Sequence, residues 1–120
     1  MLLRTLLLIC LAVPACGTAD NSPPPIKLEY PAGGPPLNEH FSFYVLNVDK
    51  QDATLVDVDA DMPAHKHGIL TDPSIELQED GRYRVDGMLL HMPGDWEIYL
   101  DLQYANGAVH RQTIPLILEH

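Results

Sequence analysis

From residue 38 onward the chain is divided into short segments in which apolar and polar residues alternate, with turn-forming residues between them. The clearest segment is 96–102, where Trp96, Ile98, Leu100 and Leu102 share one face. A period of two is typical of a β-strand, because successive side chains point to opposite faces. Outside the N-terminal stretch no segment keeps the period of 3.6 that an amphipathic helix requires. This pattern predicts an all-β domain.

About seven strands are expected, over residues 26–30, 41–48, 54–60, 74–78, 82–85, 96–102 and 109–118. Turns are expected at 49–52, at Glu79-Asp80-Gly81 and at Asn106-Gly107. In the strand over 54–60, Val56, Val58 and Ala60 alternate with Asp57 and Asp59. This many short strands in fewer than about 100 residues predict a small antiparallel, immunoglobulin-like β-sandwich, with a small barrel as the alternative.

Residues 1–15 are interpreted as a signal peptide, because Arg4 stands beside a leucine-rich run that small residues follow. The run is shorter than the roughly 20 apolar residues of a spanning helix. The segment Leu11-Ala12-Val13-Pro14-Ala15-Cys16-Gly17 resembles the lipobox of bacterial lipoproteins. The resemblance implies that Cys16 is lipidated and becomes the new N-terminus; ordinary secretory cleavage and a buried N-terminal helix are the alternatives.

We therefore expect a chain that is lipid-anchored in the cell envelope and faces the periplasm or the exterior. Gly17 stands where a retention-type Asp would stand, so the outer membrane is favoured. Residues 16–37 are rich in Pro and Gly and are expected to form a linker, in which 26–30 is a candidate edge strand. The folded domain is expected over residues 38–120.

The chain carries a formal net charge of −10 at pH 7, and removal of Arg4 with the leader makes it more negative. Such an acidic domain repels nucleic acid and anionic lipid surfaces, so a nucleic-acid partner is excluded. Loss of Cys10 with the leader leaves Cys16 as the one cysteine, and lipidation occupies its sulfur. The mature chain then has no internal disulfide and no thiolate for catalysis or metal binding.

Methionine and histidine concentrate in two windows, residues 61–68 and 87–94. Apart from Met1, every methionine lies there, with three of the six histidines. The candidate metal ligands are Met62, His65, His67, Met88, His91 and Met92. Thioether sulfur is soft and imidazole intermediate, a combination that suits Cu(I) better than Zn²⁺, Mg²⁺ or Ca²⁺. If the two windows meet at one end of the sandwich, some of these side chains can bind one Cu(I) ion.

The hypothesis depends on the backbone conformation of each window. If residues 65–67 are extended, His65 and His67 point to the same side, opposite Lys66. Met62 reaches them if Pro63 turns the chain. In the second window strict alternation places Met88 and Met92 on the face opposite His91, unless Gly87 marks a bulge. The alternative is that these methionines simply fill gaps in the core.

The remaining histidines, His40, His110 and His120, are expected to have no site role. The alternating Asp57, Asp59 and Asp61 are expected to form a solvated face, because a calcium loop would need glycine punctuation that is absent. Trp96 is expected to be the central core aromatic. A less favoured interpretation places it beside the metal as a shield.

Three stretches resemble the YtkA-like domain family. They are 62–68 (Met-Pro-Ala-His-Lys-His-Gly), 81–85 (Gly-Arg-Tyr-Arg-Val) and 90–97 (Leu-His-Met-Pro-Gly-Asp-Trp-Glu). The resemblance runs from about residue 38 to 118 and implies a small envelope β-sandwich domain. The family looks related to the FixH-type proteins that accompany copper loading of respiratory oxidases. The ligand types also look like those of the PCuAC copper chaperones, although the spacing is not matched.

Two functions follow as expectations. The first is a lipid-anchored periplasmic protein that binds Cu(I) as a chaperone, buffer or sensor, with a copper-receiving oxidase or transporter as a possible partner. The second is a non-enzymatic interaction module without metal. An enzyme is not expected, because the chain lacks a nucleophile motif, a phosphate loop and a dinucleotide fingerprint.

Overall fold

A computed structural model describes residue 17 and residues 20–119. The predicted signal peptide, the predicted lipidation site Cys16 and His120 lie outside the described residues. In the part of the chain that is described, no helix has the length and apolar character needed to cross a membrane.

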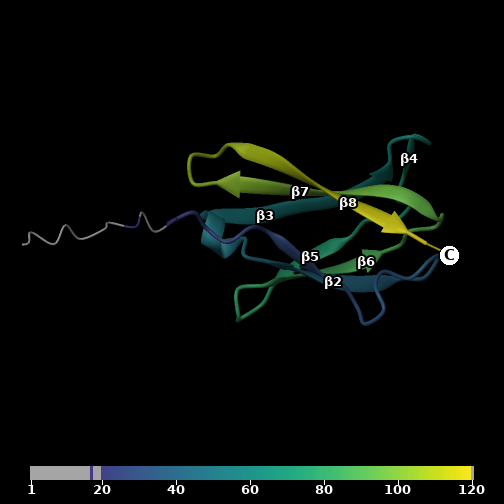
Figure 1. Cartoon of the computed structure of the whole chain (residues 1–120), viewed down its shortest axis with the longest axis horizontal. Helices are drawn as coiled ribbons and strands as arrows, with labels where there is room; N and C mark the ends of the chain where they lie inside the picture. The colour runs from purple at the N-terminus through teal and green to yellow at the C-terminus, as the bar shows by residue number, and fades with distance from the viewer. Residues whose placement is uncertain (1–16, 18–19, 120) are drawn as a thin grey trace, which may run out of the picture.

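Two four-stranded antiparallel sheets make up the described fold (Figure 1). The first has the order β1-β2-β6-β5, from β1 (Lys27–Glu29), β2 (Phe41–Leu46), β6 (Tyr83–Met88) and β5 (Ser74–Leu77). The second has the order β4-β3-β7-β8, from β4 (His67–Gly68), β3 (Ala53–Met62), β7 (Gly94–Tyr104) and β8 (Val109–Leu118). The predicted β-sandwich is therefore confirmed, and the barrel alternative is wrong because the two sheets are separate.

The expected strands all appear, and the two-residue β4 is an addition that no alternation could reveal. The expected turn at 49–52 contains a short 3₁₀ helix, η1 (Asp49–Gln51). The turn after β5 closes with the Gly81 N–H donating to the Gln78 carbonyl at 3.1 Å. The turn between β7 and β8 closes with the Gly107 N–H donating to the Tyr104 carbonyl at 2.9 Å.

The core lies between the two sheets and is made by the inward faces of their strands. In β7 the expected side chains Trp96, Ile98, Leu100 and Leu102 are all buried. Phe43 and Val45 of β2 face them from the other sheet with at most 1% exposure. Burial of these apolar side chains is the main favourable term for such a domain.

A bulge in β3 corrects the expected inward face of that strand. Val56 is 44% exposed, whereas its neighbour Leu55 is buried. Leu55 lies opposite Leu102 and Asp57 lies opposite Asp101, so Val56 is an extra residue in the register. The side-chain alternation therefore changes phase at Val56, while Val58 and Ala60 face inward as expected.

A second bulge lies in β6 at Gly87, as the sequence allowed. Phe41 pairs with Met88 and Phe43 pairs with Val85, so β6 holds one residue more than β2 between these pairs. Gly87 has a φ of +84°, which glycine adopts without strain. As a result Val85, Met88 and Leu90 are all fully buried, although strict alternation would separate the first from the other two.

The N-terminal segment joins the sandwich at one end. β1 lies inside the predicted linker 16–37, and its pairing with β2 means that the folded domain begins before residue 38. Just ahead of it, the Asn47 and Gln51 side-chain amides donate to the carbonyls of Pro25 and Pro24 at 2.8 and 2.6 Å. In Figure 1 this segment leaves at the left, whereas β4 and the C-terminal end of β8 lie at the right.

Candidate functional site

The two methionine and histidine windows meet at the end of the sandwich away from the N-terminal segment. The first window is the end of β3, the turn to β4 and β4 itself, and the second is the connection from β6 to β7 (Figure 1). Because β3 and β7 are antiparallel neighbours, the end of β3 lies beside the start of β7. The β-sheet pairing thus brings together segments that are about 25 residues apart in sequence.

The first window is a tight turn rather than an extended segment. The His65 N–H donates to the Met62 carbonyl at 3.0 Å, so the chain turns at Pro63 as the hypothesis required. Lys66 has a φ of +52°, and His67 then pairs with Met62 to form β4. The condition of an extended 65–67 segment is therefore not met, because the left-handed residue Lys66 reverses the chain.

Three histidine rings form a continuous row at this end. The rings of His65 and His67 are nearly parallel, with centroids 6.4 Å apart and an interplanar angle of 19°. The ring of His67 meets that of His91 edge-on at a centroid distance of 6.4 Å. His67 and His91 come from different windows, so this contact is direct evidence that the windows converge.

Trp96 extends the row into the core. Its ring meets that of His91 at 5.7 Å and 77°, and its indole N–H donates to the Met92 carbonyl at 2.9 Å. Trp96 is 1% exposed, which confirms it as a core aromatic. Its contact with His91 also places it beside the candidate site.

The exposure of the three histidines differs. His65 and His67 are exposed, whereas His91 is partly buried. The Nδ1 atom of His91 is buried and has no hydrogen-bond partner within the described residues. Unpaired polar atoms are uncommon in protein interiors, since each forgoes its interactions with water. This nitrogen therefore has an unused lone pair or proton, in a ring that meets His67 of the other window.

The methionines lie deeper than the histidines. Met62 and Met88 are fully buried members of the core, while Met92 is partly buried and packs against it. The Met62 methyl group lies beneath Gly94, where an added Cβ would be 2.9 Å from it. Met88 lies in the other sheet and pairs with Phe41. The structure thus brings Met62 and the second window together and places Met88 in the packing between the sheets.

No group of three or more His, Cys, Asp or Glu side chains in residues 17 and 20–119 is arranged to hold a metal ion. The other described histidines have no ring contact with the row. His40 is exposed ahead of β2, and His110 meets Tyr104 edge-on at 5.4 Å near the opposite end.

The outer face of β3 and β7 is acidic, as expected for the alternating aspartates. Asp57 and Asp59 are exposed, while Asp61 and Glu97 share the one proton of the Tyr99 hydroxyl, with oxygen–oxygen distances of 2.6 and 2.7 Å. Hydrogen bonding to Asp61, and then to Glu97, raises the pKa of Tyr99 well above its usual range.

Arg111 covers part of this face. Its guanidinium donates to the Asp101 carboxylate at 2.8 and 3.1 Å and lies 4.8 Å from the centre of the Tyr99 ring. The hydrogen bond from Arg111 lowers the pKa of Asp101.

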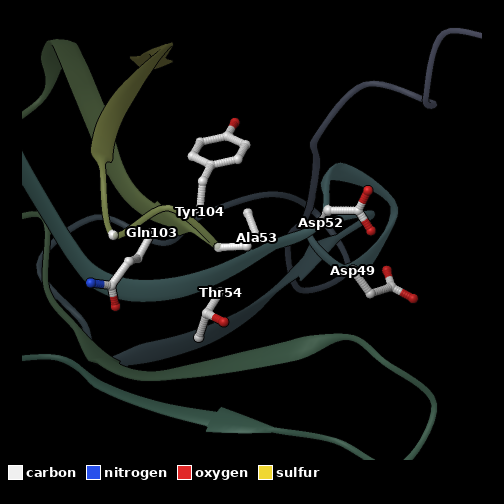
Figure 2. Close-up of a pocket in the computed structure, with 8 residues that line it drawn as sticks. Asp49, Asp52, Ala53, Thr54, Gln103 and Tyr104 are labelled. Atoms are coloured by element: carbon white, nitrogen blue, oxygen red, sulfur yellow. The ribbon is translucent and has the colours of Figure 1, made fainter.

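A cavity of about 430 Å³ lies at the opposite end of the sandwich, near the N-terminal segment. Figure 2 shows that the side chains of Asp49, Asp52, Thr54, Gln103 and Tyr104 surround it. None of the six candidate ligands lines it. This cavity is thus separate from the histidine row.

A further cavity, of about 400 Å³, lies directly beside the row. Its lining residues come from the β3–β4 turn, β7 and β8, namely Pro63, Ala64, Asp95, Trp96, Glu97, Pro115, Leu116 and Ile117. We call it the Trp96 groove. No sequence pattern reveals the groove, because its lining combines a turn and two strands that only the tertiary structure brings together; the one signal is Pro115, which indicates an edge strand.

The fold and the row of histidines define a small β-sandwich domain with an imidazole-rich end. A model of the YtkA-like family matches residues 28–101, and the chain belongs to this family. No curated protein and no solved structure matches the chain. The family assignment made from the three sequence stretches is therefore confirmed.

Proposed function

We propose that this protein binds Cu(I) at the histidine row and handles it in the cell envelope as a chaperone, buffer or sensor. The observation that carries the proposal is the meeting of His67 and His91, which come from separate windows and have ring centroids 6.4 Å apart. An imidazole nitrogen lies about 2 Å from a bound metal ion, so two rings that share one ion have centroids roughly 6 Å apart. The observed spacing suits a shared ion.

The buried Nδ1 of His91 supports the same assignment. In the tautomer that carries its proton on Nε2, the Nδ1 lone pair lacks a hydrogen-bond donor and is available to a metal ion, and binding would remove the penalty of leaving it unpaired. In this proposal His91 is the inner ligand and His67 the outer one. His65, which stacks beside His67, is exposed and serves as a third imidazole on the entry side.

The choice of Cu(I) rests on the thioethers around these rings. Met92 follows His91 directly and is partly buried, which makes it the thioether that the proposal assigns to the ion. Met62 lies beneath the adjoining Gly94 and keeps the site apolar and soft. Cu(I) is the cation that prefers sulfur and imidazole ligands over oxygen ligands. Met88 packs between the sheets, and the proposal gives it no ligand role.

The envelope location and the lipid anchor at Cys16 remain part of the proposal. They are supported by the leader-like residues 1–15 and by the use of thioethers in place of thiolates. Thioethers resist oxidation better than thiolates, so they suit an oxidising compartment.

An anaerobic competition titration tests the proposal. The full chain with Cys10→Ser and Cys16→Ser, which removes the two thiolates that would compete for the ion, is titrated with Cu(I) against a coloured Cu(I) chelator, and it is expected to withdraw one equivalent of Cu(I). The combined change His67→Ala and His91→Asn should abolish the competition. His40→Asn with His110→Asn is the matched control, because it also removes two imidazoles but leaves the row intact. Absence of competition by this cysteine-free chain with the histidine row intact, at micromolar copper, would overturn the proposal.

A fold check accompanies the titration. His91 is partly buried, so circular dichroism and the midpoint of denaturation are measured for each variant. Met92→Leu is a gentler second variant, since leucine keeps the apolar volume and removes only the sulfur. Weaker Cu(I) binding by folded Met92→Leu would support the thioether assignment, and unchanged binding would contradict it.

A further inference from the structure

The surface beside the histidine row combines exposed apolar side chains with carboxylates. The Trp96 groove is lined by Pro63, Ala64, Pro115 and Ile117, and Ile117 is 71% exposed although it is a large apolar residue. An isolated exposed isoleucine is ordinary. Several apolar residues that line one groove offer a contact surface for an apolar side chain of another molecule.

The charged residues of the groove are all acidic. Asp95 and Glu97 line it, and no lysine or arginine is among its eight lining residues. Asp61 adds a third carboxylate beside Glu97, because the two residues pair across β3 and β7. The groove is therefore an apolar floor with a negative rim, in a chain whose net charge is already −10.

This charge distribution limits what can dock there. An anionic lipid surface or a nucleic acid would be repelled by the rim. A second copy of this chain that docked through the same groove would place carboxylates against carboxylates, which repel one another. The complementary occupant is a protein surface that presents an apolar side chain surrounded by lysine or arginine.

The position of the groove links docking to the histidines. Pro63 and Ala64 immediately precede His65, and Trp96 both lines the groove and contacts His91. The residues ahead of β1 lie at the opposite end of the sandwich, and the β1–β2 loop reaches this end on the side of the second window, where the Asn38 N–H donates to the Leu90 carbonyl at 2.8 Å (Figure 1). A protein seated in the groove would hold its own surface against the histidine row.

We infer that the Trp96 groove is the docking surface for a basic partner protein that exchanges metal with the histidine row. Its role in metal exchange rests on the proposed function, whereas its role as a docking surface does not. Apolar contact in the groove supplies affinity, and the carboxylate rim supplies orientation and speed of encounter.

The test uses a defined probe and the full chain in nanodiscs of zwitterionic lipid. The probe is a fluorescein-labelled peptide of sequence Lys-Lys-Leu-Leu-Lys-Leu-Leu-Lys-Lys, and binding is followed by fluorescence anisotropy in buffer with a metal chelator. Two control peptides replace its lysines by glutamate or its leucines by serine. We expect binding of the first peptide and at least about tenfold weaker binding of both controls.

Two pairs of variants locate the binding. Ile117→Ser is compared with Leu77→Ser, because Leu77 is 59% exposed but lies in the other sheet. The pair Asp95→Lys and Glu97→Gln is compared with Glu79→Lys and Asp72→Asn, which changes the net charge equally at exposed positions elsewhere. We expect about tenfold weaker binding from each groove variant and less than about twofold change from each control.

Equal loss in groove and control variants would overturn the inference, as would failure of the unaltered chain to prefer the basic apolar peptide. Since the probe experiment contains no copper, it is read separately from the Cu(I) titration. Probe binding without Cu(I) competition would leave a docking module and remove the metal exchange. Cu(I) competition without probe binding would remove the docking surface and leave the metal site.

Discussion

The imidazole of His91 lies edge-on to the indole of Trp96, with ring centroids 5.7 Å apart. Trp96 is the only tryptophan of the chain, so its fluorescence reports on this one place. An ion bound at His91 would stand within contact range of the indole and open a quenching path. We expect Cu(I) to reduce Trp96 emission saturably, at the stoichiometry of the chelator titration.

Histidine substitutions distinguish quenching by an ion bound beside Trp96 from quenching by collision with free copper. His91→Asn should abolish the saturable change, whereas His110→Asn should preserve it, because His110 contacts Tyr104 near the other end of the sandwich. A linear, unsaturable decrease in all three proteins would mean that copper quenches by collision and does not bind beside Trp96.

Gly94 and Met62 form a close contact that predicts a double-mutant result. An alanine Cβ at Gly94 would lie 2.9 Å from the Met62 methyl group, and the φ of +128° strains any residue with a side chain. Gly94→Ala is expected to lower the free energy of unfolding by about 1–3 kcal/mol. Met62→Ala should lower it by about 2–5 kcal/mol, since it empties a fully buried site.

The combined variant is expected to lose less stability than the sum of the two single losses. The cavity left by Met62→Ala gives the new Cβ room, so only the backbone strain at Gly94 remains. Denaturant unfolding of the four proteins gives the coupling energy. Strict additivity would show that Gly94 and Met62 do not interact.

The bulge in β3 predicts opposite outcomes at adjacent residues. Leu55→Ala should lower the free energy of unfolding by about 2–5 kcal/mol, because Leu55 is 4% exposed and part of the core. Val56→Ala should change it by no more than about 0.5 kcal/mol, because Val56 is 44% exposed. Thermal or denaturant unfolding measures both, and a larger loss at Val56 would place the bulge elsewhere.

Because the side chain of Tyr30 is partly buried, we expect the folded protein to lose stability at alkaline pH. Burial raises the pKa of its hydroxyl to about 12, whereas the unfolded chain releases the same proton near about pH 10. Since the folded state keeps the proton to higher pH, the contribution of Tyr30 is complete below about pH 10 and declines as the pH rises towards 12.

Tyr30→Phe should therefore flatten the fall in the free energy of unfolding between about pH 10 and 12. The ring contact with Phe43, whose centroid is 5.7 Å away, survives this change, so stability at neutral pH should be nearly unaltered. Denaturant titrations at several pH values measure the slope. An equally steep fall in the variant would assign the alkaline sensitivity to other groups.

Much of the fold was predictable because alternation is a local property. The inward face of β7 and the turns at Gly81 and Gly107 follow from residue order alone, since each depends on neighbours in the chain. Val56 was the exception. A bulge changes the phase of a strand, and its position is decided by the pairing of β3 with β7.

The candidate site was predictable in composition and less so in geometry. The two windows did converge, and the turn at Pro63 and the bulge at Gly87 were both anticipated as conditions. The extended arrangement of His65 and His67 was not found, because the positive φ of Lys66 reverses the chain between them. The sequence also did not reveal which methionine sulfur lies near the surface, since the burial of each side chain depends on packing against the opposite sheet.

The order of residues alone thus determined the all-β class, the family and the list of candidate metal ligands, because these depend on residue type and short spacing. The tertiary structure decided that His67 and His91 meet, that Met62 and Met88 are enclosed, and that an acidic-rimmed groove adjoins Trp96. These features depend on long-range strand pairing, in which side chains far apart in sequence are brought together by backbone hydrogen bonds and by burial of the shared core.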